Sequence, residues 1–204
     1  MAINYTIQAD IVDIRSDIPK ANDIFLVDSN VWFWLAYPTA SQSSSYYQTQ
    51  DYPKYVNDAL ANGSIICGTG ISLAELAHQI EKTEYEIYSA SVNRIPPKEY
   101  RHNITKEHPR IISEVQAAWA QVKSMAAIIP VTIDEPTTDA ALLRYQTEKV
   151  DGYDLFILEA MKSQGVVQII TDDGDFATVP GIQVFTANRN VLQSAQVQGK
   201  IWVR

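Results

Sequence analysis

The sequence predicts an α/β fold built on a mostly parallel β-sheet. Short apolar runs alternate along the chain with longer segments whose apolar residues recur at helical spacing, which is typical of strands joined by crossover helices. Several of these runs are followed by Asp or Gly, as strands that end in turns are. The expected strands are residues 23–28, 64–68, 128–133, 166–170 and 182–186.

Helices are expected between these strands. One starts near Ser72, and another lies within residues 105–129, where apolar residues recur every three or four positions and form one helical face. The residues of that face are Ile111, Ile112, Val115, Ala118, Trp119, Val122, Met125 and Ala126. A further helix begins near Thr138, and the next has Asp151 as its cap and ends at Gly165.

Residues 23–204 are expected to form one domain, preceded by an N-terminal extension over residues 1–22. Apolar residues alternate with polar ones in that extension, which predicts an edge strand or a contact with a partner. Two insertions are expected, near 37–58 and 91–110. The first, rich in Ser, Gln and Tyr, reads as an exposed loop that leads into a helix, and the second is locally basic and contains proline. The final segment, "KIWVR", could add another edge strand.

Composition narrows the class of protein. With 204 residues, of which 46% are hydrophobic, the chain can bury one sizeable core. The formal net charge of −8 argues against binding nucleic acid with the whole surface, but it permits a local basic patch or a bound cation. No apolar stretch could span a membrane, and no signal peptide is recognisable. A single cysteine, Cys67, excludes an internal disulfide and a cysteine-based metal site, so a cytoplasmic location is expected.

Acidic residues lie close to the ends of the expected strands. They are Asp28 at the end of 23–28, Glu75 early in the helix after 64–68, Asp154 at the start of the helix before 166–170, and Asp172 and Asp173 after 166–170. Each alone could be a helix cap or a turn residue. Parallel strands present their carboxyl ends at one edge of the sheet, so these side chains are expected to meet there. Crowded carboxylates repel one another unless a cation or protons neutralise them, and the pattern therefore predicts a site for a hard divalent cation.

Four segments, in this order, resemble the motifs of PIN-domain nucleases: "LVDSNVW", "SLAEL", "YDLFILEAMKSQG" and "IITDDGDF". The resemblance implies a Rossmann-like three-layer α/β/α fold around a mostly parallel five-stranded sheet, and a site that binds Mg²⁺ or Mn²⁺. The acidic ligands of the family correspond to Asp28, Glu75, Asp154 and Asp173, with Asp175 as an accessory ligand. Asn30 and Thr171 correspond to residues that orient the carboxylates.

The acidic turn departs from the family pattern at Asp172, where a basic residue often stands in PIN domains. The additional carboxylate leaves open whether Asp172 or Asp173 is the ligand. Asp151, three residues before Asp154, is likewise an alternative ligand to Asp154. The two insertions also make the chain longer than the small toxin members of the family.

The resemblance implies a metal-dependent endoribonuclease that hydrolyses phosphodiester bonds in RNA. It also implies the toxin role of many PIN domains, with an antitoxin protein as partner and a homodimer as the assembled form. The residues expected to hold the RNA strand are Arg94, Lys98, Arg101, Lys106 and Arg110. Two other functions stay open. One is a catalytically inactive PIN-like module that binds RNA or protein; the other is a Rossmann-like phosphatase, although phosphatases of the haloacid-dehalogenase type carry a second Asp where Asn30 stands.

Overall fold

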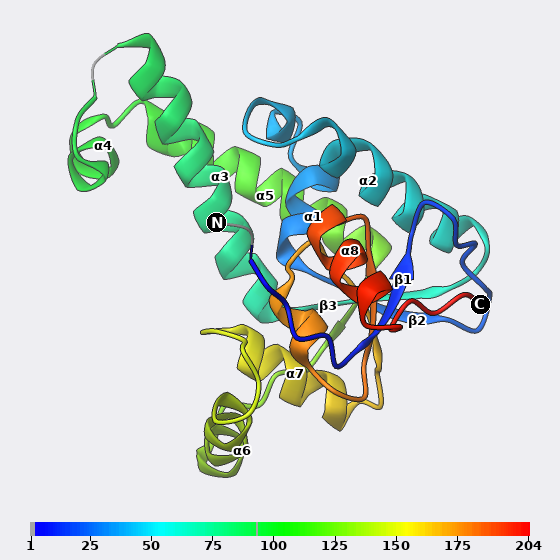
Figure 1. The fold of residues 1–204 in the computed structure, drawn as a ribbon. Helices are drawn as coiled ribbons and strands as arrows, with labels where there is room; N and C mark the ends of the chain where they lie inside the picture. Colours follow the sequence, from blue (N-terminus) through cyan, green and yellow to red (C-terminus); the bar gives the residue numbers. More distant parts are fainter. Residues whose placement is uncertain (1–2, 93) are drawn as a thin grey trace.

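The computed structural model describes residues 3–92 and 94–204. Their central feature is a six-stranded sheet with the strand order β1-β6-β5-β2-β3-β4, in which all neighbouring strands are parallel (Figure 1). The strands are β1 (Asp10–Asp13), β2 (Ile24–Val27), β3 (Ile65–Thr69), β4 (Ala127–Ile129), β5 (Gln168–Ile170) and β6 (Gln183–Thr186). The predicted α/β class and parallel sheet are confirmed. The expected number of five strands was wrong, because the N-terminal segment adds β1 beside β6.

Helices cover both faces of the sheet, which gives the three-layer arrangement. Phe25 and Val27 of β2 belong to one buried cluster, and Leu26 belongs to the other, because successive side chains of a strand point to opposite faces. The first cluster packs against α1 (Ser29–Ala36), α2 (Tyr46–Ala61), α3 (Gly70–Ser91) and α5 (Glu107–Met125). The second packs against α7 (Asp154–Ser163) and α8 (Arg189–Val197), and α6 (Glu135–Tyr145) lies against α7. Burial on both faces explains why the strands are apolar runs.

The first insertion is not the exposed loop that its composition predicts. A short 3-10 helix, η1 (Ala40–Gln42), leads into α2, whose start is fixed by a capping box between Ser45 and Gln48. Tyr52 and Tyr55 lie three residues apart on the buried face of α2, and the ring of Tyr52 packs against Trp34 with centroids 5.2 Å apart. The expected helix thus begins earlier than the composition suggests, because serine, glutamine and an internal proline are typical of loops, and two of the four residues that α2 buries are tyrosines.

The second insertion forms the tip of a helical hairpin. Helix α3 continues to Ser91, α4 spans Pro97–Asn103, and α5 returns toward the sheet from Glu107. Figure 1 shows α4 beside the end of α3 that is remote from β3. Throughout the part of the chain that the structure describes, no helix is long and apolar enough to cross a membrane.

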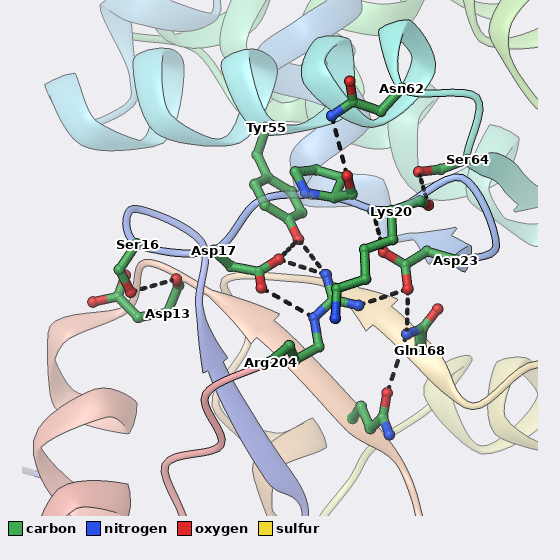
Figure 2. A network of polar contacts seen from close by, with 12 residues as sticks. Asp13, Ser16, Asp17, Lys20, Asp23, Tyr55, Asn62, Ser64, Gln168 and Arg204 are labelled. Atoms are coloured by element: carbon green, nitrogen blue, oxygen red, sulfur yellow. Dashed lines mark hydrogen bonds and ion pairs between the residues drawn. The ribbon is translucent and has the colours of Figure 1, made fainter.

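The C-terminal segment is tied to the amino ends of the strands. Its expected strand is reduced to a single bridge between Ile201 and Ile11. Beyond it, the Arg204 guanidinium is 2.5 Å from Asp17 and 2.6 Å from Asp23, which stands immediately before β2 (Figure 2). The guanidinium also lies 4.6 Å from the centroid of the Phe185 ring. These contacts lie beside the amino end of β2, on the opposite side of the sheet from the carboxyl end of that strand.

Candidate metal centre

Asp28 follows β2 directly and caps α1. Its carboxylate accepts hydrogen bonds from the Ser29 amide at 2.6 Å, from the Asn30 side-chain amide at 2.7 Å and from the Thr171 hydroxyl at 2.6 Å. Thr171 follows β5, the strand beside β2, so the parallel register of the two strands brings these residues together. Both oxygens of the Asp28 carboxylate are thereby fixed, and the side chain is 5% exposed.

The turn after β5 separates its two adjacent aspartates. The amide of Asp173 donates to the Thr171 hydroxyl at 2.9 Å, and its carboxylate accepts from the Asp175 amide at 2.9 Å, at the start of the 3-10 helix η2 (Asp175–Thr178). Asp172 instead faces α2. Its carboxylate accepts from Tyr52 at 2.7 Å, from Gln48 at 2.8 Å and from Tyr47 at 3.0 Å.

Glu75 and Asp154 approach from two helices. Glu75 lies in the second turn of α3, which follows β3 and is capped by Thr69. Asp154 is the first residue of α7 and is 9% exposed. The expectation that Asp151 caps this helix was wrong: the cap is Tyr153, and Asp151 contributes its backbone carbonyl, which accepts from the Asp154 amide at 3.0 Å.

The titration of these acids shows that they share one electrostatic environment. Burial is the main cause that raises the pKa of Asp154 to about 9, and the charges of Asp28, Asp173, Glu75 and Asp151 contribute to this rise in that order. The pKa of Asp28 is raised to about 7, mainly by burial; the charges of Glu75 and Asp173 contribute to the rise, whereas the hydrogen bonds from Thr171 and Ser29 oppose it. The pKa values of Glu75, Asp173 and Asp175 are raised as well, in each case mainly by burial. Asp151 is exposed, yet its charge acts on all of these neighbours except Asp28.

Two buried oxygen atoms of this region have no hydrogen-bond partner among the described residues: Oδ1 of Asn30 and Oε2 of Glu75. A buried oxygen without a partner is costly, as is a set of carboxylates with raised pKa values, and a cation would relieve both costs. All the donors are oxygen atoms, which suits Mg²⁺ or Mn²⁺. As the described side chains lie, no three of His, Cys, Asp or Glu are arranged to hold an ion. The oxygen donors of the site therefore fit a divalent cation in their chemistry, but the described side chains are not arranged to coordinate one.

The basic residues expected to hold RNA lie apart from the acids, along α4 and its flanking segments. Arg101 forms a two-pronged ion pair with Glu81, and Arg110 binds Glu84 and Glu107. Arg94, Lys98 and Lys106 are exposed. Two of the five predicted RNA contacts are thus already neutralised by acidic neighbours.

Tyr5 is a residue beside the acids that the sequence did not single out. Burial raises the pKa of its hydroxyl, and the charges of Asp175, Asp173 and Asp172 raise it further. The polar residues of α2 that bind Asp172 were also missed. Gln48 and Tyr52 are four residues apart, so a helix places both side chains on the same face. This spacing was the one sign of a shared role that the sequence offered.

Comparison with known proteins agrees with this architecture. The PIN domain family matches residues 25–182. A solved structure, the crystal structure of PAE2754 from Pyrobaculum aerophilum, is similar at 14% identity and a TM-score of 0.40, covering 86% of this chain and 97% of that chain. No curated protein matches the chain. Because the matched residues make up more than half of its length and include the acids described above, this chain belongs to the PIN-domain family.

Proposed function

We propose that this protein is a Mg²⁺- or Mn²⁺-dependent nuclease that hydrolyses phosphodiester bonds in RNA. The observation that carries the proposal is the group of buried and half-buried acids near the carboxyl ends of the strands, which raise one another's pKa values. Membership of the PIN-domain family supports it, because PIN domains are generally nucleases.

Asp28, Glu75, Asp154 and Asp173 would hold the cation, with Asp175 as an accessory ligand. When bound, a divalent cation lowers the pKa of a coordinated water and stabilises negative charge on a phosphate. Asn30 and Thr171 orient the carboxylate of Asp28, since both donate to its Oδ2 atom.

The protonation states of the acids support the same role. With a pKa of about 9, Asp154 carries a proton at neutral pH when no cation is bound. Metal ligands have to be deprotonated, so a cation would take the place of that proton. The site is then electrically balanced either by protons or by a cation.

The proposed substrate class rests on the family, and it has to be reconciled with the charge of the chain. A net charge of −8 disfavours nucleic acid until the acidic site is neutralised by its cation. Arg94, Lys98 and Lys106 are exposed and remain our candidates for phosphate contacts away from the acids. We keep the toxin role, the antitoxin partner and the homodimer as proposals that rest on family resemblance.

Cleavage of a labelled single-stranded RNA pool tests the proposed function. Wild-type protein is expected to cut in Mg²⁺ or Mn²⁺ and to stop in EDTA. The variants Asp28→Asn and Asp154→Asn are expected to cut at least about 100-fold more slowly. Removing a residue that only hydrogen-bonds to a metal ligand costs up to about 100-fold, and removing a ligand itself should cost at least as much.

Asp139→Asn is the matched control, because Asp139 is an exposed acid of α6 and the chemical change is the same. It should cut like the wild type. RNA binding without cleavage under either metal would favour the inactive binding module instead. Hydrolysis of a small phosphomonoester but not of RNA would favour a phosphatase.

A further inference from the structure

The N-terminal segment lies across the acidic turn, with the ring of Tyr5 on Gly174. A Cβ atom added to Gly174 would stand 2.2 Å from Cζ of Tyr5, 2.4 Å from its hydroxyl oxygen and 2.5 Å from Cε1. A side chain at position 174 would therefore displace the phenol end of the ring. Close approach and not backbone conformation favours glycine here, because its φ is −73°.

This position of Tyr5 is fixed by hydrogen bonds at its own carbonyl and at the residues that follow it. The side chain of Gln198, at the end of α8, donates to the Tyr5 carbonyl at 2.8 Å and accepts from the Ile7 amide at 2.9 Å. The amides of Gln8 and Ala9 then donate to the carbonyl of Ala177, just beyond the acidic turn. Ile7 itself is 4% exposed. Residues 5–9, which we call the N-terminal strap, are thus held by backbone hydrogen bonds and by the buried side chain of Ile7.

The phenol of Tyr5 is only partly used by this packing. The residue is half-buried, and its ring packs against the second core cluster. Across the described residues, no hydrogen bond engages its hydroxyl, although three carboxylates act on it. A tyrosine hydroxyl is a neutral donor at physiological pH. A neutral donor beside acids can bind an anion without adding further negative charge.

We propose that Tyr5 contacts the substrate, its hydroxyl donating a hydrogen bond to a phosphate oxygen of the RNA strand beside Asp173 and Asp175. This inference rests on the proposed function. It extends the site beyond the PIN-domain match, which begins at residue 25. The hydroxyl oxygen of Tyr5 is among the atoms that lie on Gly174, and this glycine stands between Asp173 and Asp175 in the chain.

The test compares Tyr5→Phe with wild type, because this variant keeps the ring on Gly174 and removes only the donor. Tyr88→Phe is the matched control: Tyr88 is a half-buried tyrosine of α3, about 20 Å along the helix from Glu75. Affinity for a single-stranded RNA oligonucleotide is measured with Ca²⁺ in place of Mn²⁺, and KM and kcat are measured with Mn²⁺. Loss of a hydrogen bond to a charged group should weaken binding and raise KM by about tenfold, with kcat little changed.

Equal affinity and equal KM for Tyr5→Phe and wild type would overturn the assignment and leave Tyr5 a packing residue. If the wild type binds RNA but never cuts it, the proposed nuclease fails, while the affinity comparison still decides the role of Tyr5. If the wild type neither binds nor cuts RNA, both proposals fall. Unfolding midpoints of the variants separate a lost contact from a lost fold.

Discussion

Asp28 and Asp154 differ in how far their pKa values rise, although both are buried. Three hydrogen bonds of 2.6–2.7 Å stabilise the ionised form of Asp28, and its pKa stays near 7. For Asp154 the main influences all raise the pKa, which reaches about 9. The acid at the start of α7 is therefore the one whose ionisation depends most on a cation.

This difference predicts how stability changes with pH when EDTA removes divalent cations. Both acids have folded-state pKa values above their unfolded values, so their favourable contribution to stability is complete below about pH 4. The contribution of Asp28 is lost as pH rises through about 7, and that of Asp154 as pH rises through about 9. Each group can contribute a slope of at most about 1.4 kcal/mol per pH unit. Denaturant unfolding between pH 5 and pH 9 should show a decreasing free energy of unfolding.

The Asp154→Asn variant isolates one of these contributions. An amide resembles the protonated acid, so the variant should gain stability relative to wild type as pH rises toward 9. A stability difference between the two proteins that stays constant over this range would contradict the electrostatic account of the site.

The positions of the acids could be predicted from the sequence, because each follows an apolar strand or begins a nearby helix. The choice between Asp172 and Asp173 could not. Both follow the same strand, and the choice depends on which side chains of α2 lie nearby. The charge of Asp173 acts on Asp28 and Asp154, whereas the carboxylate of Asp172 is held by hydrogen bonds from α2. A carboxylate where the family often has a basic residue is thus satisfied by neighbouring hydroxyl and amide groups.

At the level of elements, the inner strands were the most predictable. Strands β2, β5 and β6 lie within the expected ranges because burial on both faces requires continuous apolar residues. The expected strand at 128–133 was too long: it stops at Ile129, before a proline, which has no amide hydrogen to offer to a neighbouring strand.

Helix α2 and the N-terminal strap show what sequence patterns miss. Two of the four buried residues of α2 are tyrosines, whose polar tips made the first part of the segment resemble a loop. The contact between Tyr5 and Gly174 joins residues 169 positions apart, and no local periodicity reports it. Both elements border the acidic turn, so the parts of the site that were hidden from the sequence are those contributed by distant segments.

Considered as a whole, the molecule has a stabilising ion network at the amino end of β2 and the acidic site at the carboxyl end of the same strand. Asp23 precedes β2 and binds Arg204, while Asp28 follows the same strand and belongs to the acid group. They are five positions apart along an extended chain, or about 16 Å. The side chain of Arg204 is 3% exposed, and those of Asp17 and Asp23 are 5% and 6% exposed. Changes to this ion network should affect folding and leave the site unaltered.

Arg204→Met tests this separation. Removing one partner of a buried ion pair leaves uncompensated charges, so the free energy of unfolding should fall by about 3–5 kcal/mol. Denaturant titration measures the loss, and the affinity for Mn²⁺ should stay within about twofold of wild type wherever the variant is folded. Arg15→Met is the control, since the exposed pair of Arg15 with Asp13 should contribute no more than about 1 kcal/mol. A large loss of Mn²⁺ affinity in folded Arg204→Met would show that the ion network and the acidic site are coupled.

Calorimetric titration with Mn²⁺ tests the central claim, that the buried acids form a site for a divalent cation, most directly and without knowledge of the RNA target. The wild type and Asp139→Asn should bind the ion with the same affinity, and Asp154→Asn should bind it at least about tenfold more weakly, because it loses a charged ligand. Absence of binding to the wild type, or equal binding by Asp154→Asn, would contradict the assignment of these acids as a metal centre.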